Sequence, residues 1–380
     1  MTLALVNGRV LTPQGFRDGA AVVVEGGHIS RVCDESDAPT DGARFDLAGG
    51  DLLPGFVDVQ VNGGGGVLFN DDPCVEAIEA IAATHRRFGT TALLPTFISD
   101  DIDTMARAIA AVREAIQRGV PGVVGIHLEG PFLNAERKGV HDAAKFRALD
   151  EAAFELLTSL GVGRTLVTLA PEKTTLAMIG RLATAGVIVS AGHTNATYAE
   201  TRDALAAGLT GFTHLFNAMS PLASRAPGVV GAALEDQASW CGIIVDGRHV
   251  DPAVLRIALR CKPLQKFMLI TDAMPSVGAV EKSFQLQGRT ITVENGVCVA
   301  ADGTLAGSDL DMGQALRNAM SLLGLSLEAA AAMASDSPAR FLGDDTRGAI
   351  RAGARANMAL LTSDARISHT WIDGKCYAAE

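Results

Sequence analysis

The feature that most constrains the fold of this 380-residue chain is the alternation of short apolar runs with amphipathic helical segments. Apolar runs of this kind are typical of strands that are buried on both faces of a parallel sheet. Between them, segments such as 74–87 and 103–117 carry apolar residues at helical spacing. Eight such strands with helical connections predict a (β/α)8 TIM-like barrel, an α/β fold. The eight runs are 52–59, 91–97, 123–128, 166–169, 187–190, 211–215, 241–245 and 267–271.

Both ends of the chain have a different pattern. Short apolar segments separated by glycine-rich or polar breaks are typical of antiparallel strands and turns, and they occur near each terminus. We therefore expect one small β-sandwich domain formed by residues 1–52 and 353–380, with the barrel in residues 53–352. Residues 281–303 interrupt the barrel pattern with alternating residues around two glycines, which predicts an inserted hairpin and a candidate lid over the substrate.

Composition excludes several classes of function. The net charge of -11 repels a phosphate backbone, and two Trp with two Tyr provide few surfaces for stacking bases, so we expect no nucleic-acid partner. No apolar run approaches the length of a membrane span. The six cysteines are isolated from one another, which is typical of reduced thiols, and we expect a cytoplasmic protein. An anionic substrate would require a local cationic pocket.

Polar residues stand at the ends of four predicted barrel strands. Glu129, His193 and His214 follow the third, fifth and sixth strands, and Asp272 follows the eighth. Because catalytic residues of such barrels lie at the carboxyl ends of the strands, we expect these side chains to meet at one mouth. Three N/O ligands with an open position fit a hydrolytic metal site, and a separate carboxylate fits proton transfer. A single histidine at a strand end is usually structural, but three ligand-type residues at the same end favour the metal interpretation.

The four glycines at 63–66 allow two interpretations. They resemble a phosphate cradle, but the stretch lacks the Lys-Ser/Thr of a P-loop and the spacing of a dinucleotide-binding motif. A turn that lets the chain pass close to the site is the favoured interpretation.

Several motifs carry a family resemblance over essentially the whole chain. The chain resembles the N-acetylglucosamine-6-phosphate deacetylases of the amidohydrolase superfamily. Two of the motifs, HLEGPF and THLFNAM, are specific, whereas PGFVD marks only the wider superfamily. The matching segments are 53–58, 125–132, 190–194, 213–222, 245–249 and 269–274.

The resemblance implies a role for each candidate site residue. Glu129, His193 and His214 would bind a divalent metal, Asp272 would act as general base and then general acid, and His141 would help to position or polarise the acetyl carbonyl. Arg225 and His249 would hold the substrate phosphate, partly from a neighbouring subunit, so a homodimer is implied. The implied substrate-binding residues are Gln60, Asn62, Val140, His141, Asn217, Ala218, Arg225, Asp246, His249, Leu305, Ala306 and Gly307.

The chain departs from the wider superfamily at two places. Many members carry His-x-His after the first strand, where this chain has Gln60 and Asn62, and many carry a carboxylated lysine after the fourth, where residues 169–171 are Leu-Ala-Pro. One divalent metal per subunit is therefore expected rather than two. Zn²⁺ suits a Glu/His/His/water site, and Fe²⁺ or Mn²⁺ also fits this ligand set.

The expected reaction is hydrolysis of the acetamide of N-acetylglucosamine 6-phosphate to glucosamine 6-phosphate and acetate. Three alternatives remain open: N-acetylgalactosamine 6-phosphate as the substrate, an N-acylated amino acid, and a catalytically silent barrel that serves as an assembly protein. The implied phosphate ligands disfavour the amino acid, and the intact set of four site residues disfavours the silent protein.

Overall fold

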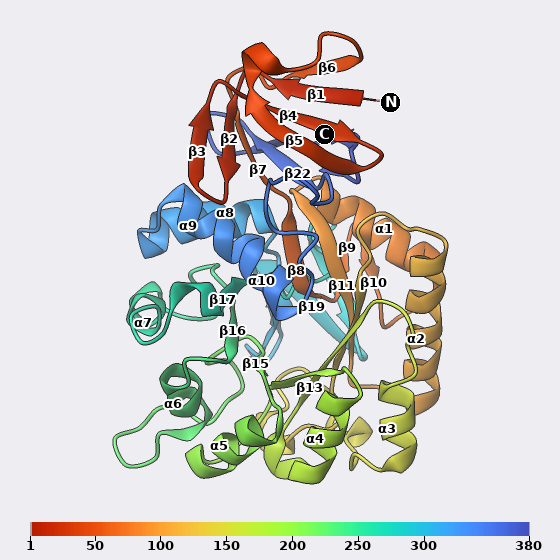
Figure 1. Cartoon of the computed structure of the whole chain (residues 1–380). Coiled ribbons are helices and arrows are strands. Elements are labelled where there is room, and N and C mark those ends of the chain that lie inside the picture. The colour runs from red at the N-terminus through yellow and green to blue at the C-terminus, as the bar shows by residue number, and fades with distance from the viewer. Residues whose placement is uncertain (1, 380) are drawn as a thin grey trace.

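The computed structural model describes residues 2–379 and confirms the predicted barrel (Figure 1). Eight parallel strands are hydrogen-bonded in chain order. The ring closes where the backbone N–H of Asp272 donates to the carbonyl of Gln60, at 3.0 Å. The barrel strands are β8 (Phe56–Val61), β11 (Thr90–Ile98), β12 (Gly125–Glu129), β13 (Arg164–Leu169), β14 (Ile188–Ala191), β15 (Gly211–Phe212), β16 (Trp240–Ile243) and β17 (Phe267–Leu269).

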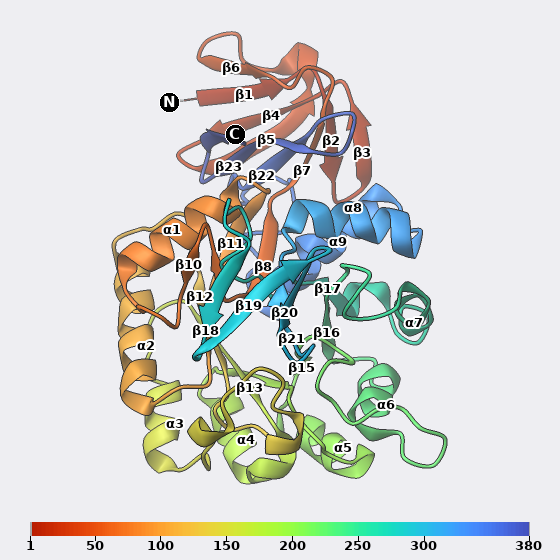
Figure 2. The same ribbon diagram turned by 180° about the vertical axis from the view of Figure 1, so that it is seen from behind.

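Helices connect the strands and cover the outside of the barrel (Figures 1 and 2). The start and stop signals are local: the N-cap of α5 is Thr197, whose side chain forms a capping box with Glu200, and its C-cap is Gly208, with a φ of 120°. The α-helices are α1 (Val75–Arg86), α2 (Ile102–Gln117), α3 (Glu151–Leu157), α4 (Leu176–Thr184), α5 (Tyr198–Ala207), α6 (Gly228–Glu235), α7 (Pro252–Ala258), α8 (Met312–Leu323), α9 (Leu327–Ala334) and α10 (Asp336–Phe341). Short 3-10 helices are η1 (Glu35–Asp37), η2 (Ala135–Arg137), η3 (Ala143–Lys145), η4 (Pro171–Lys173) and η5 (Leu264–Lys266). Within residues 2–379, none of the helices is both long and apolar enough to span a bilayer.

The two termini together form a β-sandwich at one end of the barrel (Figure 1), as predicted. One sheet has the strand order β5-β4-β1-β6, and the other has the order β24-β23-β22-β7-β2-β3, so strands from both ends of the chain share the second sheet. Leu5, Val22, Met358 and Trp371 lie in the core between the sheets. The strands are β1 (Thr2–Val6), β2 (Arg9–Thr12), β3 (Gly15–Asp18), β4 (Ala20–Glu25), β5 (His28–Asp34), β6 (Ala43–Asp46), β7 (Asp51–Pro54), β22 (Met358–Leu361), β23 (Ile367–Ile372) and β24 (Lys375–Ala378).

The first predicted barrel strand, 52–59, is wrong as a single element. Its beginning is β7, which pairs with β2 and β22 in the sandwich, and the barrel strand β8 starts only at Phe56. Gly55 lies between the two strands. A Cβ at this position would lie 2.3 Å from the side chain of Thr91, so a larger residue would clash. The close approach of the neighbouring strand thus requires glycine where the chain passes from the sandwich into the barrel.

The predicted hairpin at 281–303 belongs to a larger antiparallel sheet (Figure 2). Its strands are β18 (Ser283–Leu286), β19 (Arg289–Glu294), β20 (Val297–Ala300) and β21 (Leu305–Ser308). Leu286 and Ile291 pack in one apolar cluster with Ile98, the last residue of β11, and with Met274, which follows β17. Gln287, at the turn between β18 and β19, donates to the carbonyl of Ser99. The insertion is therefore packed as a wall of the barrel mouth, and a lid function stays a prediction.

Of the four glycines at 63–66, the first two form the short strand β9 (Gly63–Gly64), and the last two form the tight turn to β10 (Val67–Leu68). Gly65 and Gly66 have φ values of 64° and 86°, in the left-handed region that favours glycine. This is the turn that the sequence favoured.

Candidate metal centre

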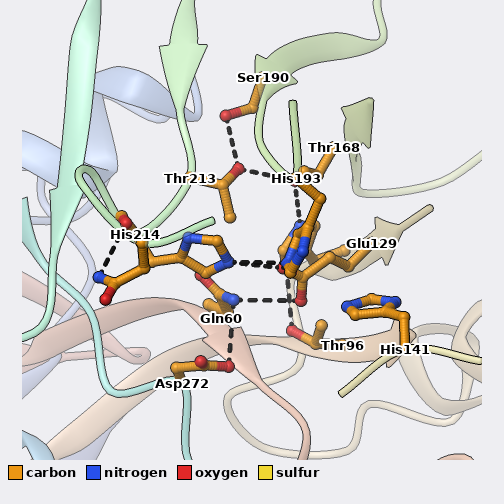
Figure 3. Close-up of polar contacts among 12 residues, drawn as sticks. Gln60, Thr96, Glu129, His141, Thr168, Ser190, His193, Thr213, His214 and Asp272 are labelled. Atoms are coloured by element: carbon orange, nitrogen blue, oxygen red, sulfur yellow. Dashed lines mark hydrogen bonds and ion pairs between the residues drawn. The ribbon is translucent and has the colours of Figure 1, made fainter. Parts of the chain in front are cut away.

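The three predicted metal ligands meet at the barrel mouth (Figure 3). Oε1 of Glu129 lies 3.1 Å from Nε2 of His193 and 2.9 Å from Nε2 of His214, and the two imidazole nitrogens are 3.1 Å apart. All three side chains are buried. One carboxylate oxygen and two imidazole nitrogens at these separations are the donor set of a single divalent cation with an open fourth position.

The tautomer of His193 fits this interpretation. Its Nδ1 lies 2.8 Å from the backbone carbonyl oxygen of Arg137, which can only accept a hydrogen bond. Nδ1 therefore carries the proton, and the lone pair of Nε2 is available to a metal. His193 and His214 also have φ values of 48° and 33°, which non-glycine residues adopt rarely and mainly where the surroundings enforce it at functional sites.

The electrostatics of the cluster also favour a cation. Burial opposes ionisation of Glu129, but its hydrogen-bond and electrostatic interactions with the imidazoles of His193 and His214 together outweigh burial and hold the pKa of Glu129 well below its ordinary value. Burial is the largest single effect and lowers the pKa of His214, but the hydrogen bond to Glu129 and the negative charges of Glu129 and Asp272 together outweigh it, and the pKa is raised. The cluster thus holds an ionised carboxylate that attracts positive charge, which a divalent cation would supply in place of protons.

Asp272 lies beside this cluster (Figure 3), and two side-chain amides hold its carboxylate. Nε2 of Gln60 donates to its Oδ1 at 3.1 Å, and Nδ2 of Asn62 donates to the same oxygen at 2.7 Å. The same nitrogen of Gln60 is 3.1 Å from Oε2 of Glu129, so Gln60 bridges the two carboxylates. Burial, followed by the negative charge of Glu129, raises the pKa of Asp272 to about 6. A carboxylate with this pKa suits reversible proton transfer near neutral pH.

His141 approaches the cluster from the loop after β12. Its ring centroid lies 4.4 Å from that of His193, and its Nδ1 is 2.8 Å from Oγ of Ser99. Burial, followed by the neighbouring His193, lowers the pKa of His141 to about 3, so its imidazole is neutral at physiological pH. A neutral imidazole with one N–H is a hydrogen-bond donor that adds no charge. Ser99, which holds this ring, was not among the residues singled out in the sequence.

A cavity of about 320 Å³ opens over these groups. This volume is at the small end of the range for small-molecule sites. The predicted site residues that line it are Asn62, Glu129, Val140, His141, His193, His214, Asn217, Ala218, His249, Asp272, Leu305 and Gly307. Residues that the sequence interpretation missed also line it: Ile98, Glu136, Arg137, Gly139, Ile244, Met274 and Thr304.

Four predicted substrate-binding residues lie outside the cavity lining. Gln60 stands behind Asp272 and Glu129, and Ala306 is fully buried in the wall formed by the insertion. Asp246 holds His249, whose Nδ1 is 2.6 Å from Oδ2 of Asp246. Arg225 is exposed on the loop before α6 and does not line the cavity of its own chain. Within one chain, the predicted cationic pair Arg225 and His249 is therefore not assembled.

Comparison with known proteins places these features in a family. The chain matches the amidohydrolase family over residues 52–376. It is 42% identical to N-acetylgalactosamine-6-phosphate deacetylase of Shewanella sp. (strain ANA-3), over 98% of this chain and 95% of that protein. The crystal structure of N-acetylglucosamine-6-phosphate deacetylase from Pasteurella multocida superposes with a TM-score of 0.96 at 37% identity and covers 100% of both chains.

A further solved structure contains a substrate. This is a mutant of N-acetyl-D-glucosamine-6-phosphate deacetylase from Mycobacterium smegmatis in complex with N-acetyl-D-glucosamine-6-phosphate. It is 33% identical to this chain, with a TM-score of 0.91 and 99% of each chain covered. The barrel, the buried Glu/His/His cluster and these full-length similarities agree. The chain therefore belongs to the amidohydrolase family and, within it, to the N-acetylhexosamine-6-phosphate deacetylases.

Proposed function

We propose that this protein hydrolyses the acetamide of N-acetylglucosamine 6-phosphate, giving glucosamine 6-phosphate and acetate. The observation that carries the proposal is the position of Asp272 beside the cluster of Glu129, His193 and His214 in one cavity. A metal-ligand set with an adjacent, separate carboxylate is the arrangement that amide hydrolysis requires. Family membership and the substrate in the M. smegmatis complex support the choice of substrate.

Glu129, His193 and His214 would hold one divalent metal per subunit, with Zn²⁺ as the proposed ion and Fe²⁺ or Mn²⁺ as alternatives. Such an ion polarises a carbonyl oxygen and lowers the pKa of a water molecule. The two amides at positions 60 and 62 contact Asp272 rather than completing a second ligand set, which supports a single metal.

The proton transfers fall to Asp272. Above a pH of about 6 its carboxylate is ionised and can accept a proton from the attacking water. Gln60 and Asn62 keep it in place by donating to Oδ1. Asp272 then returns the proton to the amine nitrogen of the leaving sugar. A hydrogen bond donated by the hydroxyl of Ser99 to Nδ1 of His141 would leave the proton on the other ring nitrogen, which could then donate to the acetyl oxygen, where negative charge develops.

The phosphate of the substrate would bind at the part of the cavity lined by Asn217, Ala218 and His249. His249 is oriented for this by Asp246. Because Arg225 is exposed and outside the cavity of its own chain, we propose that it reaches the phosphate bound by a second copy in a homodimer. A guanidinium supplied in this way would give an acidic protein the local cation that an anionic substrate needs.

A second candidate substrate is N-acetylgalactosamine 6-phosphate. The observation that favours it is the 42% identity to the Shewanella protein of that name, which exceeds the 37% identity to the P. multocida protein. The two sugars differ only in the orientation of one hydroxyl group. A site that hydrogen-bonds a substrate hydroxyl discriminates strongly against an analogue in which that bond is lost.

The test is acetate release from both sugar phosphates by the metal-loaded protein, with N-acetylglucosamine and an N-acetylated amino acid as controls. We expect kcat/KM for N-acetylglucosamine 6-phosphate to exceed that for its epimer by about tenfold or more, the lower bound for one mismatched group. A higher kcat/KM for N-acetylgalactosamine 6-phosphate would instead identify that sugar phosphate as the substrate. No acetate from either phosphate, with the metal bound, would instead support the silent assembly protein.

A further inference from the structure

Glu172 is a carboxylate close to the metal centre that the proposed reaction does not use. It follows β13, the barrel strand between those that carry Glu129 and His193, and it lies in the short helix η4. Its Oε1 accepts hydrogen bonds from Nδ2 of Asn134 at 2.8 Å and from the backbone N–H of Asn195 at 2.6 Å. Its Oε2 accepts one from Oγ1 of Thr194 at 2.5 Å. One half-buried carboxylate thus receives three donors from two loops.

Each donor is connected to His193. Thr194 and Asn195 directly follow it in the chain. The backbone N–H of Asn134 donates to the carbonyl of His193 at 2.9 Å. Glu172 therefore holds the main chain on the carboxyl side of His193 and, through Asn134, the carbonyl of His193 itself.

The orientation of the His193 ring depends on the same network. Oδ1 of Asn195 accepts from Nε of Arg137 at 2.5 Å, and the carbonyl oxygen of Arg137 is the acceptor for Nδ1 of His193 at 2.8 Å. Displacement of Asn195 would move the carbonyl that fixes the tautomer and direction of this ring. In metal sites, groups that orient ligating histidines in this way control affinity.

The network also joins the loop that carries His214. The backbone N–H of Thr194 donates to the carbonyl of Ala218 at 3.0 Å, and the N–H of Ser220 donates to the carbonyl of Thr194 at 3.1 Å. Thr194 is fully buried between the two loops. A displacement at Thr194 would therefore be transmitted to both histidine loops.

We propose that Glu172 is a positioning residue for the metal centre, which holds the loop after His193 so that the ligand set binds a divalent cation tightly. A carboxylate is suited to this task because it only accepts hydrogen bonds and has enough lone pairs for all three donors. It also stabilises the left-handed backbone of His193, a conformation that its surroundings must enforce. The inference rests on the proposed metal site and not on the identity of the sugar.

The test is Zn²⁺ binding by metal-free protein, measured by titration against a competing chelator. We expect Glu172→Ala to raise the Zn²⁺ dissociation constant by about tenfold, at the lower end of the effect of losing groups that orient ligands. Glu172→Gln should have a smaller effect in the same direction, because its amide oxygen still accepts from Asn134 and Asn195. With Co²⁺ in place of Zn²⁺, the visible spectrum of Glu172→Ala should differ from that of the wild type.

Glu200→Gln is the matched control. Glu200 lies in the helix that follows the same loop, and its carboxylate accepts from the backbone N–H and side chain of Thr197, the N-cap of that helix, rather than from Thr194 or Asn195. A purely structural role for Glu172 would lower the melting temperature of metal-free protein while leaving the Zn²⁺ affinity and the Co²⁺ spectrum as in the wild type. That result would overturn the proposal.

If Glu172→Ala does not fold, a pair of variants at position 194 gives the answer. Thr194→Val removes the hydroxyl that contacts Glu172, whereas Thr194→Ser keeps it. Weaker Zn²⁺ binding in the valine variant that is restored in the serine variant supports the proposal, and equal binding in both overturns it. Normal Zn²⁺ binding by the wild type without acetate release would overturn only the deacetylase proposal. A wild type that binds no Zn²⁺ would overturn the metal site and this inference together.

Discussion

The side-chain amide of Asn62 donates a 2.7 Å hydrogen bond to Oδ1 of Asp272, and Gln60 donates to the same oxygen. These two amides stand where many amidohydrolases carry the His-x-His pair that binds a second metal. In this chain the same positions hold the proposed general base. The residues were expected to bind substrate, and only Asn62 of the two lines the cavity.

Asp272→Asn should bind metal normally and lose activity. Asp272 is not among the three clustered donors, so the metal content of the variant should equal that of the wild type. Without a group that accepts and returns the proton, kcat should fall by about 10²–10⁴-fold. Elemental analysis and acetate release on the same preparation measure both quantities, and near-normal turnover would contradict the assignment of Asp272 as base.

The activity of the wild type should fall on the acidic side because Asp272 must be ionised to accept a proton. Its pKa is raised to about 6 without a cation beside it, and a bound cation lowers it, so the acid limb of kcat/KM should lie at or below pH 6. The hydrogen bond from Asn62 lowers this pKa. Asn62→Leu should therefore move the limb to higher pH by about one unit, the equivalent of one hydrogen bond to a charged group. A pH profile with the limb unmoved would show that Asn62 does not tune the base.

Removal of the metal should abolish activity reversibly. A chelator should yield inactive protein, and Zn²⁺ should restore acetate release at one ion per chain. Metal at about 100 times its dissociation constant stabilises the folded state by about 2.7 kcal/mol, so the melting temperature should also rise on reloading. His214→Ala lacks one of the three donors. Added Zn²⁺ should restore neither its acetate release nor its melting temperature. Full activity in the presence of the chelator would exclude a metal-dependent mechanism.

Arg225 should act on the site of a second copy. Arg225→Ala alone should raise KM for the phosphorylated substrate, and Asp272→Asn alone should be inactive. If the two variants are mixed and allowed to exchange subunits, the mixed dimer contains one site with both Asp272 and a partner guanidinium. Activity of about a quarter of the wild type per subunit is expected under substrate conditions where Arg225→Ala alone is nearly inactive. A mixture no more active than its components, or a monomer by light scattering, would contradict the proposal.

Asp58 should make the stability of the metal-free protein depend on pH. Burial raises its pKa to about 7, and hydrogen bonds from Thr271 and the backbone of Gln60 only partly offset this. Because the folded state binds this proton more tightly than the unfolded chain, the contribution of Asp58 to stability is present at low pH. It is lost as the pH rises from about 4 to 7.

Asp58→Asn should remove this dependence while keeping acceptors for the backbone donors. The free energy of unfolding of each protein is compared at pH 4 and at pH 7. Over this rise in pH, the value for the variant should increase relative to that for the wild type by on the order of 2–4 kcal/mol. Urea denaturation of metal-free protein at both pH values measures it. Parallel pH dependence in the two proteins would show that Asp58 ionises normally.

Part of this structure follows from local sequence patterns. Apart from the start of the first, the eight barrel strands could be predicted because apolar runs and helical spacing indicate burial over a few residues. The sequence also places four site residues at one mouth, because the parallel strands of a barrel end on the same face. These residues are Glu129, His193, His214 and Asp272. Gly55 shows the limit: nothing nearby in the sequence reveals that a neighbouring strand leaves no room for a side chain there.

The contacts that define the site were decided by the tertiary structure alone. Gln60 and Asp272 are 212 positions apart in the chain, and only closure of the barrel brings the amide to the carboxylate. The same holds for Glu172 in η4, because only the folded chain brings its three donors from the adjacent loops to its carboxylate. The sequence by itself determined which strands form and which ligand types stand at their ends, because these depend on short-range patterns of polarity. Which polar atoms pair with one another depends on distances across the barrel, and those exist only in the folded chain.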